Sequence, residues 1–186
     1  MNKLRRKRSA LTFFGPLVPL LVLPSLANAH LMPAQRGTLN ILDGAVFMVL
    51  SLPVSAFHAV GLDEDGDGTF SPREVDDHRG PILDAVKHNV VLVDSQGRAE
   101  LVGVMLSFGD SHGHVVDSIS QVTVVGRFNM NAFARPLRFE VGLYGLQAQE
   151  QVLEITAARK RDKRKTTFEL TPATPVGHIG FNSYTF

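Results

Sequence analysis

The chain has 186 residues, of which 44% are hydrophobic and 20% charged, and it contains no cysteine. These values are typical of a globular protein, and they exclude a disordered tail, a collagen-like repeat and a disulfide-stapled miniprotein. The formal charge of +1 depends on five basic residues in the first eight positions; without them, 14 basic side chains face 18 acidic ones. Because binding to nucleic acid depends on neutralising phosphates, this acidic remainder argues against a nucleic-acid partner.

The first 29 residues have the layout of a secretory signal peptide. A basic segment at residues 3–8 precedes an apolar segment at residues 11–26, and Ala27-Asn28-Ala29 supplies the small residues of a cleavage point before His30. Three prolines interrupt the apolar segment, which argues against a membrane anchor, since a spanning helix needs about 20 apolar residues. We therefore expect a mature protein without a membrane span, located in the periplasm or secreted.

Alternation of apolar and polar residues predicts β-strands through most of the mature chain. Residues 38–42 and 46–52 flank Asp43-Gly44, a strong signal for a β-hairpin. The same pattern predicts six further strands, at residues 89–93, 100–108, 122–128, 137–143, 153–157 and 167–170. Short strands separated by turn residues favour a mainly β fold, specifically an antiparallel β-sandwich of the immunoglobulin-like type. The pattern leaves open whether residues 175–186 form a last strand or a loose tail.

Two helical segments interrupt the strands. Residues 54–60 form a short candidate helix, and residues 72–87 form a longer one that we expect to break at Gly80-Pro81, because the residue before a proline avoids helical geometry. Ser71, Pro72 and Glu74 are suited to the N-cap, first and third positions of this longer helix. The sequence thus predicts a helix-loop-helix insertion at about residues 54–88.

The loop between these helices, residues 63–74, reads DEDGDGTFSPRE. Acidic residues occupy its positions 1, 3 and 5, glycine position 6, an apolar residue position 8, serine position 9 and glutamate position 12. This pattern resembles the calcium-binding loop of EF-hand proteins, and the resemblance covers only the loop and its flanks. It implies a Ca²⁺ ion ligated by Asp63, Asp65, Asp67, the Thr69 backbone carbonyl, Ser71 (directly or through a water) and both carboxylate oxygens of Glu74.

The charge of this region independently favours a divalent cation. Seven carboxylates lie between residues 63 and 77 and would repel one another without a counter-ion. Calcium suits six to eight oxygen ligands and a flexible loop better than magnesium does. Phe70 is expected to point away from the ion and to hold the loop against the core. The sequence has no second loop of this kind, which favours a structural or stabilising ion, although a sensor role remains open.

Two other groups of residues suggest further binding. The run RKRDKRK at residues 159–165 lies between two strands, and we interpret it as a solvated hairpin tip that protects a sheet edge; a patch that binds a polyanion is the alternative. Cleavage before His30 would place an α-amino group and an imidazole on one residue, which resembles the copper-binding histidine brace of secreted copper proteins and oxidative polysaccharide monooxygenases. A copper ion would need at least one more histidine, and the candidates are His112, His114 and His178.

The sequence contains no nucleophile elbow, phosphate-binding glycine loop or zinc-protease helix. We therefore expect a signal peptide (1–29) and a single domain (30–186) that acts as an exported calcium-binding module rather than as a conventional enzyme. A periplasmic copper protein that uses His30 is one alternative. The other is a domain whose calcium loop orders a surface for an unidentified protein partner.

Overall fold

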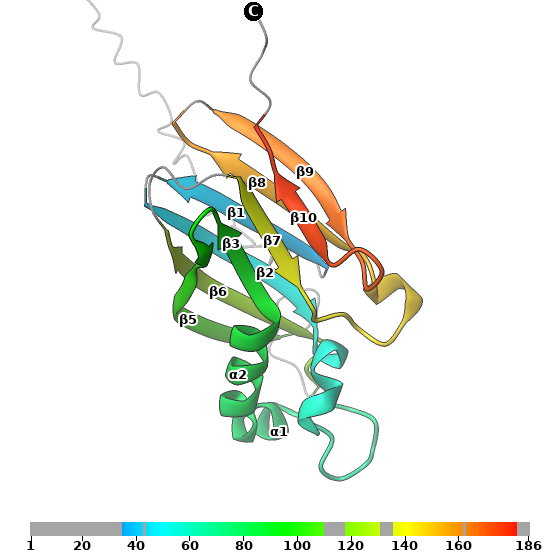
Figure 1. Ribbon diagram of the computed structural model, residues 1–186. Helices are drawn as coiled ribbons and strands as arrows, with labels where there is room; N and C mark the ends of the chain where they lie inside the picture. Colours follow the sequence, from blue (N-terminus) through cyan, green and yellow to red (C-terminus); the bar gives the residue numbers. More distant parts are fainter. Residues whose placement is uncertain (1–34, 43, 110–117, 131–135, 162, 182–186) are drawn as a thin grey trace, which may run out of the picture.

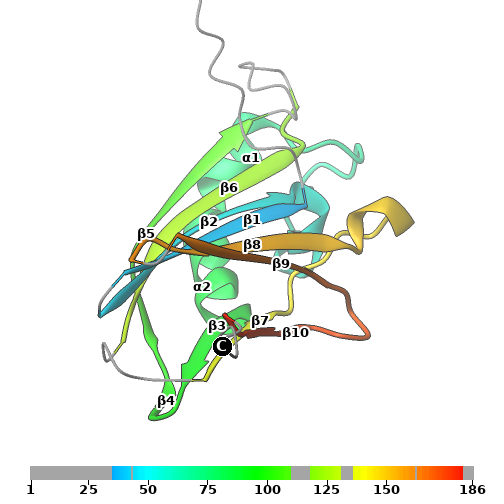
Figure 2. The same cartoon turned by 90° about the horizontal axis from the view of Figure 1, so that it is seen from above.

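The computed structural model describes residues 35–42, 44–109, 118–130, 136–161 and 163–181. Two β-sheets face each other across one hydrophobic core, and the helices of the insertion gather at one end of the sheets (Figures 1 and 2). One sheet has the strand order β5-β6-β2-β1-β8-β9, and the other has the order β10-β7-β3-β4. The mainly β fold that the sequence predicts is therefore present.

The bounds of the strands agree closely with the predicted segments. The larger sheet contains β1 (Arg36–Leu42), β2 (Ala45–Pro53), β5 (Glu100–Gly109), β6 (Gln121–Asn129), β8 (Leu153–Arg159) and β9 (Arg164–Leu170). The smaller sheet contains β3 (Val90–Asp94), β4 (Gly97–Arg98), β7 (Leu137–Val141) and β10 (Val176–Ile179). The sequence did not predict the two-residue β4. Part of the C-terminal stretch that the sequence pattern left open forms the strand β10.

Alternation along the strands places apolar side chains between the sheets. In β2, Val46 and Met48 are fully buried, whereas Phe47 between them is 43% exposed. The rings of Phe128 from the larger sheet and Phe139 from the smaller sheet meet edge to face, with centroids 6.3 Å apart. This edge-to-face contact joins β6 and β7 across the core between the two sheets.

The prediction of purely antiparallel pairing is wrong. β1 pairs antiparallel with β2 on one side but parallel with β8 on the other, with Arg36 to Ile41 aligned with Glu154 to Arg159. The larger sheet is therefore mixed. Residue alternation fixes which face of a strand is buried but not which strand lies beside it, so the sequence pattern could not reveal this pairing.

The insertion lies between β2 and β3, as expected, but its helices differ in detail. The first, η1 (Val54–Val60), is a 3-10 helix with non-helical geometry at Phe57. The longer segment is divided into α1 (Pro72–Asp77) and α2 (Arg79–Asn89) at His78, not at Gly80-Pro81. Pro81 falls in the first turn of α2, where a backbone N–H has no helical partner, so proline is tolerated there.

The start of α2 also covers an edge of the larger sheet. The guanidinium of Arg79 donates a hydrogen bond to the carbonyl of Leu106 in the edge strand β5, at 3.2 Å, and lies 4.7 Å from the ring centroid of Phe108. A side chain that occupies backbone groups of an edge strand hinders pairing with another chain. Among the residues that the structure describes, no helix is both long and apolar enough to cross a membrane.

Candidate metal site

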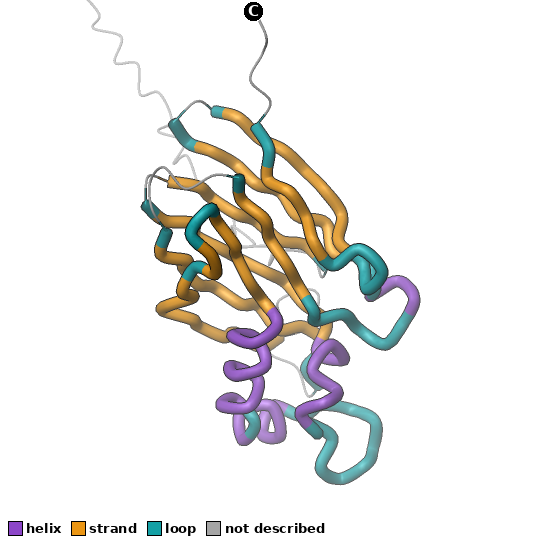
Figure 3. Tube along the Cα trace, viewed as in Figure 1, coloured by secondary structure: helices purple, strands orange, loops and turns teal. Residues whose placement is uncertain are grey.

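The acidic loop projects from the helical end of the molecule, between η1 and α1 (Figure 3). Asp63, Asp65 and Asp67 each direct a carboxylate oxygen to one small region, and these oxygens lie within 4.8 Å of one another. The loop begins immediately after Leu62, which is 1% exposed and fixes the start of the loop in the core. Three converging carboxylates are a ligand set that a hard divalent cation prefers.

Hydrogen bonds within the loop orient these carboxylates. The N–H of Gly68 donates to Asp63 Oδ2 at 3.1 Å, and the N–H of Asp67 donates to Asp65 Oδ1 at 3.1 Å. The N–H and the hydroxyl of Thr69 both donate to Asp67 Oδ1 at 2.7 Å. Backbone N–H groups of residues 67–69 therefore hold the carboxylates of all three aspartates.

Two glycines make this coil sterically possible. Gly66 and Gly68 have φ angles of +75° and +79°, in the left-handed region that residues with a Cβ atom rarely adopt. No other atom lies within 4 Å of a Cβ built at either position, so the requirement for glycine comes from the backbone rather than from space. The sequence pattern identified Gly68 as the bend but gave Gly66 no role.

One oxygen in the cluster lacks a partner. Asp63 Oδ1 is inaccessible to solvent and has no hydrogen-bond donor among the described residues. A buried carboxylate oxygen without a partner is costly, because it has lost water and gained nothing in exchange. A cation bound between the three aspartates is one way to satisfy this atom.

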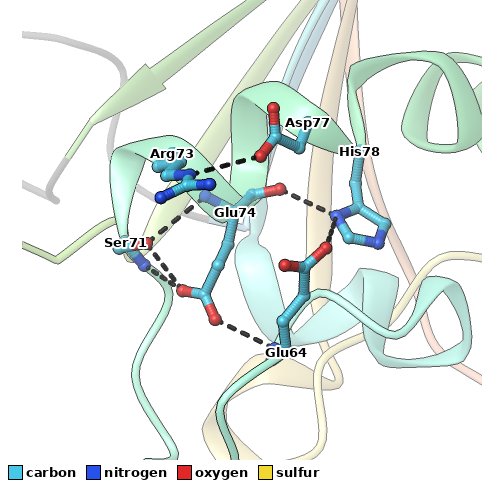
Figure 4. Close-up of polar contacts among 6 residues, drawn as sticks. All are labelled: Glu64, Ser71, Arg73, Glu74, Asp77 and His78. Atoms are coloured by element: carbon cyan, nitrogen blue, oxygen red, sulfur yellow. Dashed lines mark hydrogen bonds and ion pairs between the residues drawn. The ribbon is translucent and has the colours of Figure 1, made fainter.

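Glu74, at position 12 of the loop, is buried and caps α1 (Figure 4). Its Oε2 accepts hydrogen bonds from the N–H and the hydroxyl of Ser71, at 2.8 and 2.7 Å, and its Oε1 accepts one from the N–H of Glu64 at 2.9 Å. The N–H of Glu74 donates in return to Ser71 Oγ at 3.3 Å, which completes the predicted capping box. Glu74 is not among the described carboxylates that lie within 4.8 Å of one another.

These hydrogen bonds stabilise the ionised carboxylate. They lower the pKa of Glu74 to about 2, with the Ser71 side chain as the largest cause, followed by the Ser71 and Glu64 backbone. Because the folded-state pKa is lower than the unfolded one, the contribution of Glu74 to stability is complete above about pH 4.5 and is lost as the pH falls towards 2.

We therefore expect acid to destabilise the calcium-free protein partly through Glu74. Between pH 5 and pH 2, in chelator, the urea midpoint of the wild type should fall more steeply than that of Glu74→Gln, which has no carboxylate to protonate. Urea unfolding at fixed ionic strength measures both slopes. Parallel slopes would show that Glu74 keeps an ordinary pKa in the folded protein.

The structure adds two contacts that sequence reasoning missed. His78 Nδ1 lies 2.8 Å from the carbonyl oxygen of Glu74 and 3.8 Å from Glu64 Oε1, so its Nδ1–H donates to the end of α1 beside the loop. The N–H of Ile119 donates to the carbonyl of Phe70 at 2.7 Å. The Phe70 side chain packs against the core, as expected, and its backbone joins the loop to the segment that precedes β6.

The histidines proposed for copper are largely beyond what the structure describes. His30, His112 and His114 lie outside the described residues. His178 is exposed on β10, where it pairs with Arg138 of β7. The histidine brace therefore stays a prediction from the sequence alone.

The chain matches no known protein-family model, and no curated protein is similar to it at a significant level.

Proposed function

We propose that this protein is an exported calcium-binding module, in which a single EF-hand-type loop inserted in an immunoglobulin-like sandwich holds one structural Ca²⁺ ion. The ligands are the carboxylates of Asp63, Asp65 and Asp67 together with the other loop residues, Thr69 (backbone carbonyl), Ser71 and Glu74. The convergence of the three aspartate oxygens within 4.8 Å of one another is the observation that carries this proposal.

The unpartnered Asp63 Oδ1 adds support, since it is the buried oxygen that a cation would satisfy. Like charges repel, so three carboxylates held this close together carry an electrostatic cost that a bound cation would remove. Here the backbone N–H groups of the loop hold the carboxylates together. The loop is thus organised in advance for a cation, which lowers the entropy lost on binding.

Completion of the ligand set requires Glu74 to exchange partners. Its carboxylate now bonds to Ser71 and Glu64 at the two ends of the loop. Binding the ion with both oxygens would replace these hydrogen bonds, and the cap would be exchanged for two metal–oxygen bonds. This exchange opposes binding, which favours a site of modest affinity, with a Kd of about 10⁻⁴–10⁻³ M as in extracellular calcium modules.

A structural ion of this affinity stabilises the fold by mass action. At a calcium concentration ten times the Kd, the gain is about 1.4 kcal/mol. The Phe70–Ile119 hydrogen bond connects the loop to the segment that precedes β6. Ordering of the loop would therefore also stabilise the start of that strand.

Calorimetric titration of the exported protein with CaCl₂ tests the proposal. We expect one ion per chain, a submillimolar to millimolar Kd, weaker binding of Mg²⁺, and a melting temperature that rises with the logarithm of calcium concentration. The proposal is overturned if about 10 mM CaCl₂, ten times the weakest expected Kd, produces neither binding heat nor a change in melting temperature.

A further inference from the structure

We propose that the β8–β9 hairpin docks the protein on a bilayer surface rich in anionic phospholipid. The basic hairpin is defined here as residues 159–161 and 163–165, which end β8, lie in the turn and begin β9. The proposal is independent of calcium binding, because it concerns the opposite end of the molecule (Figure 1).

Four cations of the basic hairpin are exposed: Lys160, Arg161, Lys163 and Lys165. None of the four forms an ion pair with another described residue, in contrast to Arg36, Arg73, Arg79 and Arg138, which each pair with a carboxylate. Residues 159–165 contain six basic residues and one acidic residue, so like charges lie close together at a cost in free energy. An anionic partner would recover that cost.

The remaining two arginines hold the hairpin in position. The Arg159 guanidinium lies 4.6 Å from the ring centroid of Phe181, and Arg164 Nη1 donates to the Phe181 carbonyl at 3.3 Å. Arg159 and Arg164 are also directly paired across the hairpin. The exposed cations therefore extend from a fixed base rather than from a loose loop.

The shape of the basic hairpin selects an extended anionic surface over a small anion. A single phosphate is bound where several donors converge on one point. Here the cations are spread over the end of a hairpin: Lys165 lies on the outer face of the sheet, paired with Ala158 of β8, whereas Lys160, Arg161 and Lys163 lie in the turn. Projecting charges reach many headgroups at once, and each Lys or Arg at such a surface contributes about a fivefold gain in partitioning.

The composition of the tip argues against a protein partner. Protein interfaces depend on buried aromatic and apolar side chains, and the exposed residues of the tip carry only charge. The acidic loop lies at the far end of the molecule (Figure 1), so docking through the basic hairpin keeps its carboxylates away from the negative surface.

Cosedimentation with phosphatidylglycerol vesicles, in chelator and low salt, tests the proposal. The protein is recovered from an exporting host and its N-terminus is identified by mass spectrometry, so that all variants share the same N-terminus. We expect the substitutions Lys160→Gln, Arg161→Gln, Lys163→Asn and Lys165→Gln together to lower partitioning several hundredfold. Asparagine is chosen at 163 because that residue has a φ of +54°.

A matched pair of double variants separates the basic hairpin from overall charge. Lys160→Gln with Arg161→Gln should lose about 30-fold in partitioning, whereas Lys87→Gln with Arg127→Gln, which removes the same charge elsewhere, should lose less than about twofold. Unchanged melting temperatures confirm that the variants fold. Equal losses in the two pairs, no binding to the vesicles, or tighter binding to duplex DNA than to the vesicles would each overturn the proposal.

Discussion

Replacing Asp63 by alanine is expected to weaken calcium binding by about 100-fold or more. Loss of a group that merely orients a metal ligand costs roughly 10- to 100-fold in affinity, and we propose Asp63 as a direct ligand. Its Oδ1 is buried without a partner, so removal of the side chain removes a ligand and not an existing hydrogen bond to that atom. Titration calorimetry of wild type and variant measures the effect.

The same variant separates metal binding from folding. With saturating calcium, Asp63→Ala should melt at a lower temperature than the wild type. In chelator the two should melt within about 1–2 °C of each other, because the loss of the Gly68 hydrogen bond to Oδ2 is offset by removal of the buried, unpartnered Oδ1. Asp84→Asn, an exposed acid on α2, removes the same charge and should leave calcium binding intact. A melting shift of equal size with and without calcium would contradict the role of Asp63 as a ligand.

Truncation of Phe128 to alanine is expected to cost the largest amount of stability, about 3–5 kcal/mol. The side chain is fully buried and its ring meets that of Phe139, so the variant leaves a cavity where the two sheets touch. The loss should be the same in calcium and in chelator, because this contact lies between the sheets and not in the loop. Urea unfolding provides the measurement.

Phe47→Ala is the matched control on the neighbouring strand β2. Phe47 is 43% exposed on the outer face of the same sheet, so its truncation should cost much less. Similar losses for the two variants would show that the two sheets do not depend on the Phe128–Phe139 contact.

Local patterns predicted most of the secondary structure. The Asp43-Gly44 turn identified the β1–β2 hairpin, and alternation identified strands within a few residues of their ends. The pairing of β1 with β8 could not be predicted, because it depends on contacts between distant segments. The helix break was expected at Gly80-Pro81, but proline is compatible with a first helical turn, and the break lies at His78.

Local patterns also predicted the local features of the candidate site, but not its contacts with distant residues. Residue spacing identified Asp63, Asp65 and Asp67, which the structure brings together, and the cap formed by Ser71 and Glu74. Spacing could not show that Glu74 also accepts a hydrogen bond from Glu64, or that Ile119 holds Phe70, because those contacts form only when the chain has folded.

The parallel pairing of β1 with β8 has a consequence for how this chain folds. Arg36 meets Glu154 more than a hundred residues later in the sequence, so β1 cannot complete its place in the sheet until most of the chain is available. Closure of such long segments slows folding, since its entropy is lost before the contacts form. If residues 1–29 direct export, this delay would help to keep the polypeptide extended and able to pass through a translocation channel before it acquires its native structure.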